Sequence, residues 1–398
     1  MVIDRAQASS RASFDRDMTA NRVGWVCADR TEGVNALYPG CGDRAGRRML
    51  RRSSRGSPHG MPDNRNMHER GLLEQLGEGP VSGDTLARRA GLTRAAIWNR
   101  IAALREAGIE VEASPGRGYQ LRRPVSLLDA SGIEAALPAP VRHGLAGLEV
   151  AWSLDSTSSE LLRRGPPTHG TRVLLAERQT GGRGRRGRAW ASPLAAHVSF
   201  SVSRRFAGGL SRLGGLSLVA GVAAADALRA LGVADIGLKW PNDLVVPAGH
   251  GVRKLGGILV EGGGEHAGPV HAVVGIGVNV RLPASAAAGI DQPWTDLAHC
   301  PGVANDDASP VDRNAVAVAM LSALLPALEG FDRDGLAPFL PKFATFDALA
   351  GREVLVRDGD REHVGVARGV AADGGLRLAL AGGREQVFHA GETSVRAR

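Results

Sequence analysis

The sequence predicts an α+β protein of several domains, with helices near its start, a mixed-sheet α/β region in its middle and short strands at its end. Three patterns indicate this. Amphipathic helical spacing occupies residues 68–107, apolar strands alternate with helical stretches over residues 147–345, and short strands separated by Gly and Asp turns fill residues 346–398. Because each pattern keeps to its own stretch of chain, we expect separately packed domains.

The composition of the 398-residue chain is that of an ordinary soluble protein, with 43% hydrophobic residues. No run reaches the roughly 20 apolar residues of a membrane span, and the N-terminus lacks the apolar core of a secretory signal. Cys27, Cys41 and Cys300 are spaced too widely for a disulfide framework or a zinc site. We therefore expect a cytoplasmic protein with no membrane partner.

The charge is strongly basic, with a formal net charge of +8. Such a charge suits a nucleic-acid or phosphate-bearing partner. Of the 49 basic residues only Lys239, Lys254 and Lys342 are lysines. In so arginine-rich a chain, a lysine indicates a position that needs a compact point charge instead of a planar guanidinium. Lys239 and Lys254 lie in motifs described below.

Residues 1–66 show no sustained helical or strand period, and arginine outnumbers the acidic residues there. We interpret them as a disordered basic extension, or as an upstream mis-called start with Met61 or Met67 as the true one. A basic arm that helps to grip DNA is the alternative, although no motif supports it.

Residues 67–123 are predicted to form a winged helix-turn-helix domain. The expected elements are a helix over 68–76, a second helix capped by Ser82 or Asp84, a turn at Gly91, a third helix over 94–107 capped by Thr93, and a hairpin of strands 109–112 and 119–121. Two short helices with a glycine turn, a third helix and a hairpin are typical of this DNA-binding fold.

The third helix would face the DNA major groove over Thr93–Arg100. Side chains able to reach phosphates or base edges are Thr93, Arg94, Asn99, Arg100 and, on the wing, Arg117. Trp98 is expected to pack against the domain. The alternative is a scaffold that binds no operator, because a fold alone does not prove a function.

A linker is expected over 124–146, followed by an α/β domain over 147–345. Its predicted elements are a doubly buried strand at 173–176, a strand at 198–203 with apolar residues on one face and serines on the other, a helix at 216–231, strands at 258–261 and 273–280, and a helix at 313–328. The hairpins of residues 346–398 are best closed as a small barrel.

Residues 181–190 hold four arginines and four glycines and end on Trp190. Glycines let backbone N–H groups approach an anion, and arginines fork onto phosphate oxygens. The segment follows a buried strand, where ligand sites of α/β proteins form. A solvated basic loop or a non-specific RNA-binding run is the alternative.

Lys239-Trp240-Pro241-Asn242-Asp243 ends a strand with a sharp turn. It offers a cation for phosphate and a carboxylate for ribose, magnesium or another polar group, as an ATP site requires. An ordinary turn with surface charges is the alternative.

Two further strands carry interior glycines, one after Lys254 at Gly256-Gly257 and one at Gly275-Ile276-Gly277. Interior glycine indicates that a ligand or another backbone comes close. The second strand is not a dinucleotide fingerprint, because it does not open a helix. Ser156 and Thr157 supply hydroxyls for a neutral polar head group, or cap a helix, or both.

Taken together, these segments resemble the biotin–protein ligases, in particular the bifunctional kind that also represses biotin synthesis genes. The resemblance runs from about residue 67 to the end. It rests on Asp155-Ser156-Thr157, Gln179 with the loop at 182–190, Lys239–Asp243, the segment 253–261 and Gly275–Val280. It implies a biotin/lipoate-ligase-like central fold, an SH3-like barrel, biotin and ATP as substrates, and Mg²⁺.

The resemblance also implies roles for single residues. Those assigned to biotin are Ser156, Thr157, Ser158, Gln179, Arg183, Gly184, Arg185 and Lys254. Those assigned to ATP or the adenylate are Arg183, Arg185, Arg186, Trp190, Lys239, Asn242, Asp243, Asn279 and Trp294. Lys254, Arg185 and Asp243 would be catalytic, with Asp243 on the metal. Ser158 departs from the asparagine common in the family.

The partners implied are a lysine of a biotin carboxyl carrier domain, operator DNA and a second copy of the chain in the adenylate-bound state. Three other functions stay open. They are a lipoate-type ligase, a ligase whose winged helix does not regulate transcription, and a regulator whose central domain only senses a ligand.

Overall fold

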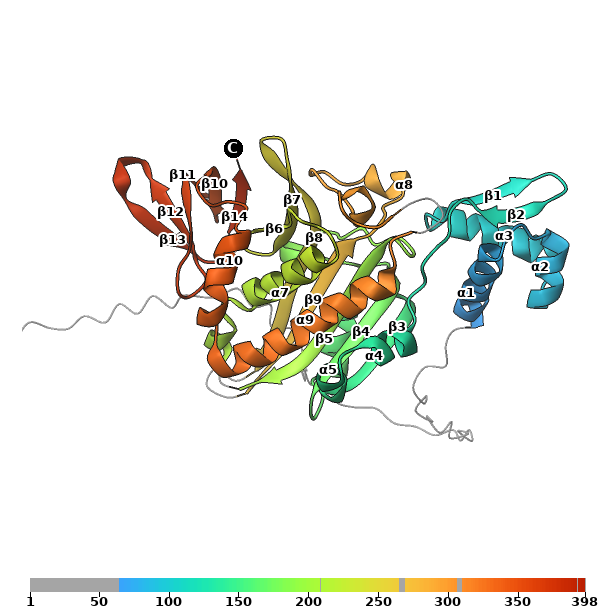
Figure 1. The fold of residues 1–398 in the computed structure, drawn as a ribbon, viewed down its shortest axis with the longest axis horizontal. Coiled ribbons are helices and arrows are strands. Elements are labelled where there is room, and N and C mark those ends of the chain that lie inside the picture. The colour runs from blue at the N-terminus through green and yellow to red at the C-terminus, as the bar shows by residue number, and fades with distance from the viewer. Residues whose placement is uncertain (1–63, 208, 265–268, 306–309, 392, 398) are drawn as a thin grey trace, which may run out of the picture.

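The computed structural model describes residues 64–397, except 208, 265–268, 306–309 and 392. A seven-stranded sheet forms the middle of the molecule, with the helix-rich domain at one end and a five-stranded sheet at the other (Figure 1). Most of the expected N-terminal extension, residues 1–63, lies outside the described residues.

The first domain is a winged helix-turn-helix, which confirms the prediction. Its elements are α1 (Asn64–Gly77), α2 (Gly83–Ala90), α3 (Arg94–Glu106), β1 (Val111–Ser114) and β2 (Gly118–Leu121). Ser82 caps α2 by accepting from the Thr85 N–H, and Thr93 caps α3 by accepting from the Ala96 N–H. Gly91 ends α2 at φ 64°, a backbone conformation that favours glycine.

The segment expected to be a linker contains two short helices, α4 (Ala130–Ala136) and α5 (Ala139–His143). Leu128 and Ile133 are fully buried in the core of the central domain. The chain between the two domains is therefore packed onto the central domain over most of its length.

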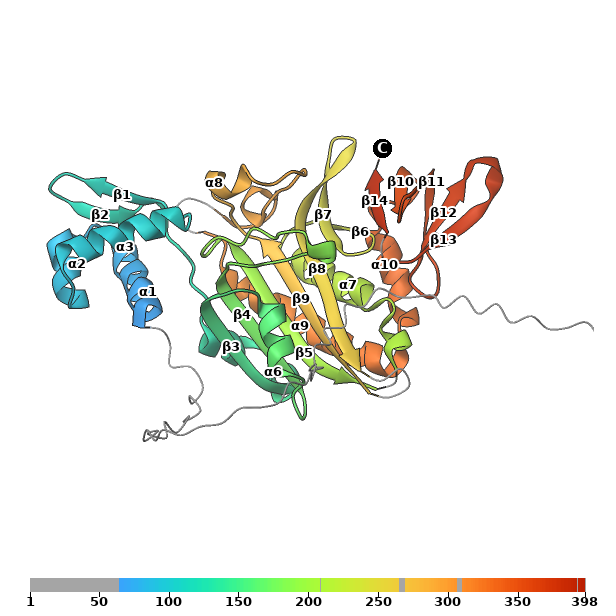
Figure 2. The same ribbon diagram turned by 180° about the vertical axis from the view of Figure 1, so that it is seen from behind.

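The central sheet has the strand order β3-β4-β5-β9-β8-β7-β6, antiparallel except for the pair β3 and β4. The strands are β3 (Leu145–Leu154), β4 (Thr171–Gln179), β5 (His197–Phe206), β6 (Gly237–Lys239), β7 (Asp243–Ala248), β8 (Gly251–Gly264) and β9 (Val270–Asn279). Helices α7 (Leu216–Ala230) and α9 (Arg313–Asp334) lie on one face, and α6 (Thr157–Arg164) lies on the other (Figures 1 and 2).

One expectation about β5 is wrong. Its alternation of apolar residues and serines predicts a strand buried on one face only, yet Ser199, Ser201 and Ser203 are at most 1% exposed. Helix α6 covers this face, and the hydroxyls of Thr157 and Ser158 on α6 bond to the Ser201 hydroxyl. The alternation of serine with apolar residues therefore marks a covered polar face and not a solvated one.

The chain ends, after α10 (Leu340–Phe346), in an antiparallel sheet of order β13-β12-β11-β10-β14. Its strands are β10 (Glu353–Asp358), β11 (Arg361–Val370), β12 (Leu376–Leu380), β13 (Glu385–Phe388) and β14 (Ser394–Ala397). The Trp240 indole N–H donates to the Gly374 carbonyl at 2.9 Å, which fixes this domain beside the central sheet.

Helix α9 is long and apolar enough, by length and composition, to cross a membrane. Met320, Leu324 and Leu328, on one side of the helix, are completely buried in the central core. Core packing therefore accounts for its hydropathy.

Candidate functional site

Two lysines pair with one carboxylate at the β6–β7 turn, and arginines add positive charge near them. The Lys254 Nζ lies 2.7 Å from the Asp243 Oδ1, and the Lys239 Nζ lies 4.0 Å from the Asp243 Oδ2. Burial lowers the pKa of Lys239, and the charges of Lys254, Arg396 and Arg188 lower it further, against Asp243. An excess of cations over carboxylates at one place is the electrostatic signature of an anion site.

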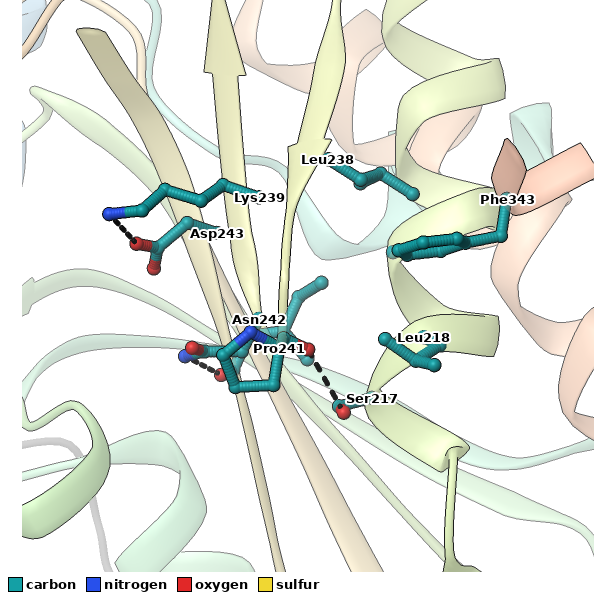
Figure 3. Close-up of a pocket in the computed structure, with 10 residues that line it drawn as sticks. Ser217, Leu218, Leu238, Lys239, Pro241, Asn242, Asp243 and Phe343 are labelled. Atoms are coloured by element: carbon teal, nitrogen blue, oxygen red, sulfur yellow. Dashed lines mark hydrogen bonds and ion pairs between the residues drawn. The ribbon is translucent and has the colours of Figure 1, made fainter. Parts of the chain in front are cut away.

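The turn that holds this cluster is built by Trp240 and Pro241. Trp240 is buried, and the peptide bond that follows it is cis. The Ser217 hydroxyl, at the start of α7, donates to the Pro241 carbonyl at 3.2 Å. Figure 3 shows Lys239 and Asp243 directed to one side of the turn, away from Phe343. The apolar contacts of the turn therefore lie on one side, and the charged side chains lie on the opposite side.

Asn242 faces a different neighbour. Its side-chain amide donates to the Ile258 carbonyl at 2.9 Å, and its Oδ1 accepts from Arg185 at 3.4 Å. Arg185 also donates to the carbonyls of Gly391 and Thr393 in the C-terminal domain. One arginine of the glycine-rich loop therefore joins the loop, the β6–β7 turn and the C-terminal sheet.

The arginines of the glycine-rich loop point to two different parts of the site. Arg183 pairs with Glu261 at 2.9 Å and donates to the Ser159 hydroxyl at 2.7 Å, on the α6 side. Arg185 lies on the side of Asp243, whose charge opposes the lowering of the Arg185 pKa by burial. Arg186 is exposed, with φ 60°, and makes no contact with the Asp243 cluster among the described residues.

A cluster of hydroxyl and amide groups, the hydroxyl cluster, lies at the start of α6. Thr157 donates to the Gln179 side-chain oxygen from its backbone N–H at 2.9 Å and from its hydroxyl at 3.2 Å. The hydroxyls of Thr157, Ser158 and Ser201 form one bonded group. Thr157, Ser158 and Gln179, all predicted to contact biotin, therefore meet in this cluster. Ser156 caps α6 at its edge.

The glycines of β9 make room for side chains, where the sequence predicted a ligand or another backbone. A Cβ at Gly277 would lie 2.9 Å from the Trp190 ring, and a Cβ at Gly275 would lie 2.5 Å from the Ser158 hydroxyl. Each glycine therefore gives way to a side chain of the site. The Trp190 ring also lies 5.6 Å from the Lys254 Nζ, which connects the loop to the charged cluster.

Asn279 and Trp294 take less direct positions. Asn279 is buried and donates its amide to the Thr295 carbonyl at 2.8 Å. Trp294 is half-buried and pairs with Lys254 through the backbone. Both residues therefore lie near Lys254, at the edge of the site. Gly184 lies in the glycine-rich loop, where its N–H donates to the Arg188 carbonyl at 2.7 Å.

Sequence reasoning missed four residues of this site. Ser201 completes the hydroxyl cluster, Arg188 and Arg396 add charge at Lys239, and the His197 ring packs edge-on against the Trp190 ring, with 5.9 Å between the ring centroids. The serine alternation of β5 pointed to Ser201, and the glycine-rich loop contained Arg188. Arg396 belongs to another domain, and only the packing of the two domains brings it here.

Three of the expected DNA-contacting residues on α3, Thr93, Arg94 and Asn99, are exposed, as is Arg117 on the wing. Arg100 departs from this pattern, because it is half-buried and its Nη1 is enclosed. The expectation for Trp98 is wrong. This side chain is 61% exposed, since Ile97 and Ile101 fill the core at their own turn of α3.

Asp243 is the carboxylate of the cluster that was predicted to bind a metal. Among the described residues no group of three or more His, Cys, Asp and Glu side chains could hold an ion. A single carboxylate still fits Mg²⁺, which binds proteins through one or two carboxylates together with substrate phosphates.

Three families match the sequence, one for each domain. Residues 69–120 match an HTH domain, residues 151–279 match the Biotin/lipoate A/B protein ligase family, and residues 350–396 match the Biotin protein ligase C terminal domain. The order of the matches is the order of the three folded parts.

Similar proteins agree with these matches. The chain is 37% identical over 308 residues to the bifunctional ligase/repressor BirA of Salmonella typhimurium, covering 77% of this chain and 91% of that protein. It is 35% identical over 238 residues to the biotin–[acetyl-CoA-carboxylase] ligase of Paracoccus denitrificans, covering 58% and 94%. The structure of the Aquifex aeolicus biotin protein ligase in complex with biotin and ATP matches with a TM-score of 0.51 and 26% identity, covering 64% and 99%.

Proposed function

This chain belongs to the family of bifunctional biotin–protein ligases and repressors, and we propose that it activates biotin with ATP and transfers it to a lysine of a carrier protein. The observation that supports this most directly is the Asp243 cluster, with its excess of cations, together with the uncharged hydroxyl cluster of α6. One end suits a polyphosphate and the other a neutral polar head group.

In the first step a carboxylate oxygen of biotin attacks the α-phosphorus of ATP. The bond from that phosphorus to the oxygen of the β-phosphate breaks, and pyrophosphate leaves with the electron pair. Lys254, held at 2.7 Å from Asp243, would stabilise the charge that gathers on the α-phosphoryl oxygens. Arg185 would hold phosphate, and Thr157 and Gln179 would orient the biotin head group.

In the second step the amine of the carrier lysine attacks the acyl carbon of the adenylate. The bond from that carbon to the phosphate oxygen breaks, AMP leaves, and the amine loses a proton. A biotin carboxyl carrier domain would be the acceptor, and the adenylate-bound protein would form a homodimer in the cytoplasm. Mg²⁺, held by Asp243 and the phosphates, would offset phosphate charge.

The direct test is pyrophosphate release by the purified chain with ATP and either biotin or lipoate. We expect release with biotin and little with lipoate. Release only with lipoate would assign the chain to the other branch of the family, and no release with either acid would overturn the ligase proposal.

Arg396, which no sequence motif assigned to the site, is expected to contribute to ATP binding. Replacing it with alanine should raise KM for ATP about tenfold, roughly 1.4 kcal/mol of binding, because its charge acts on Lys239 at the phosphate end. KM for biotin should not change. Arg377, an exposed arginine paired with Glu385 on the same sheet, is the matched control. Equal KM values for ATP in the two variants would remove Arg396 from the site.

We further propose that the winged helix binds operator DNA. The exposed Arg94 and Asn99 on α3 and Arg117 on the wing favour this function. Asn99→Ala should weaken binding to a selected duplex site by about 1–3 kcal/mol and relax its sequence preference. Arg333→Ala, which changes an exposed residue at the far end of α9, is the control. Pyrophosphate release should be normal in both variants, and DNA binding by the Asn99 variant at the wild-type level would contradict the assignment.

A further inference from the structure

One group of buried polar atoms has no hydrogen-bond partner among the described residues. The ring nitrogens of His197 make no hydrogen bond of ordinary geometry, although the Asn279 side chain lies near enough to interact with the ring, and the Trp190 indole N–H and the Ser199 hydroxyl have no partner in the described part of the chain. His197 is 2% exposed and Ser199 is 1% exposed. A buried polar group left unpaired is costly, so three residues that carry such groups at one place call for a partner, and a bound ligand would supply one.

The three residues share one face of the central sheet. In the β5–β9 register His197 lies opposite Asn279, and Ser199 lies opposite Gly277. The Trp190 ring covers Gly277 and meets the His197 ring edge-on at 5.9 Å. Since alternate residues of a strand share a face, His197 and Ser199 lie on the same face of β5 as Ser201 of the hydroxyl cluster.

The imidazole of His197 is neutral. Burial lowers its pKa to about 3, and the charge of Arg313 acts in the same direction, while a weaker hydrogen-bonding interaction with the Asn279 side chain raises the pKa. A neutral imidazole offers one N–H donor and one acceptor nitrogen. It is suited to an uncharged polar group and gives no charge for a phosphate to pair with.

The position of this group decides which part of a ligand it meets. Trp190 stands between it and the charged cluster, with its ring 5.6 Å from the Lys254 Nζ. In the proposed function the cations near Lys239 bind the phosphates, and the hydroxyl cluster of Thr157, Ser158 and Ser201 binds the head group of the acid. The uncharged portion of ATP that remains is its nucleoside.

We propose that His197 is a nucleotide-binding residue whose neutral imidazole hydrogen-bonds the nucleoside half of ATP and of the acyl-adenylate, next to Trp190 and Ser199. The proposal rests on the ligase function above and adds a residue to its site. The affinity that His197 contributes should therefore depend on the nucleoside and be independent of the triphosphate.

The test uses the full chain with His197→Phe, which keeps a ring against Trp190, and His197→Asn, which restores a donor and an acceptor. The Phe variant should raise KM for ATP about tenfold and leave KM for biotin within about twofold, and the Asn variant should recover most of the loss. Inhibition by inorganic tripolyphosphate, which has no nucleoside, should be equal in all three proteins. His197→Leu replaces the Phe variant if that variant does not fold.

His271→Phe is the matched control, since His271 lies on the same face of β9 but bonds to Ser203 at 2.8 Å, away from Trp190. An unchanged KM for ATP in the folded Phe or Leu variant, an equal rise in KM for biotin, or a parallel loss of tripolyphosphate inhibition would overturn the proposal. Calorimetry of ATP binding to the wild-type and His197 variants tests the role of His197 without turnover. Absence of biotin-dependent turnover in the wild-type protein would refute the ligase function alone.

Discussion

Lys254→Ala is expected to lower kcat/KM for biotin-dependent pyrophosphate release by roughly 100-fold to 1,000-fold, the loss typical when one group that stabilises developing charge is removed. The Lys254 ammonium is already positioned, because Asp243 holds it at 2.7 Å and the Trp190 ring lies over it. Removing it also leaves Asp243 without its closest partner, and a bare carboxylate repels phosphate.

Lys254→Arg should restore little of this activity. The Lys254 Nζ lies between the Asp243 carboxylate, at 2.7 Å, and the Trp190 ring, at 5.6 Å, so a larger planar guanidinium would not keep the same position. Lys342→Ala is the control, because Lys342 lies on the surface of α10, is 54% exposed and pairs with Asp226 of α7. Single-turnover formation of the adenylate is the measurement. A Lys254→Ala rate within tenfold of wild type would show that charge at this position is not catalytic.

The sequence alone predicted that Lys254, Asp243 and the glycine-rich loop act together, but it did not supply the contacts. Lys254 and Asp243 meet because β7 and β8 pair antiparallel, with a register shift next to Val245 that aligns Val245 with Lys254. Motif spacing does not encode such a shift. The motifs therefore identified the chemistry, and strand register determined which atoms touch.

Two features lay beyond sequence reasoning for physical reasons. Arg396 reaches the site through the docking of the C-terminal sheet, which depends on contacts such as that of Trp240 with Gly374. The serines of β5 follow the pattern of a half-exposed strand, yet α6 covers them. In both cases a tertiary contact between distant segments decides the environment, and local periodicity contains no information about it.

A buried ion pair near the winged helix leads to the largest expected change in stability. Arg313, at the start of α9, lies 2.5 Å from Glu177 on β4, and the two side chains are 2% and 0% exposed. Arg313 also donates to the carbonyls of His197 and Ser126, and Glu177 accepts from the Leu128 N–H. The pair thus fastens the segment that follows the winged helix to the central sheet.

Arg313→Met should destabilise the central domain by about 3–5 kcal/mol, because it leaves a buried carboxylate without a counter-charge. The double variant Glu177→Gln/Arg313→Met should recover a large part of that loss, since no unpaired charge remains. Urea unfolding of both variants and of Glu177→Gln completes a double-mutant cycle. The exposed pair Arg377–Glu385 is the control and should contribute at most about 1 kcal/mol. A loss below that value for Arg313→Met would mean that water reaches Glu177. A full loss in the double variant would mean that the hydrogen bonds to Ser126 and Leu128, and not the ion pair, hold this segment to the sheet.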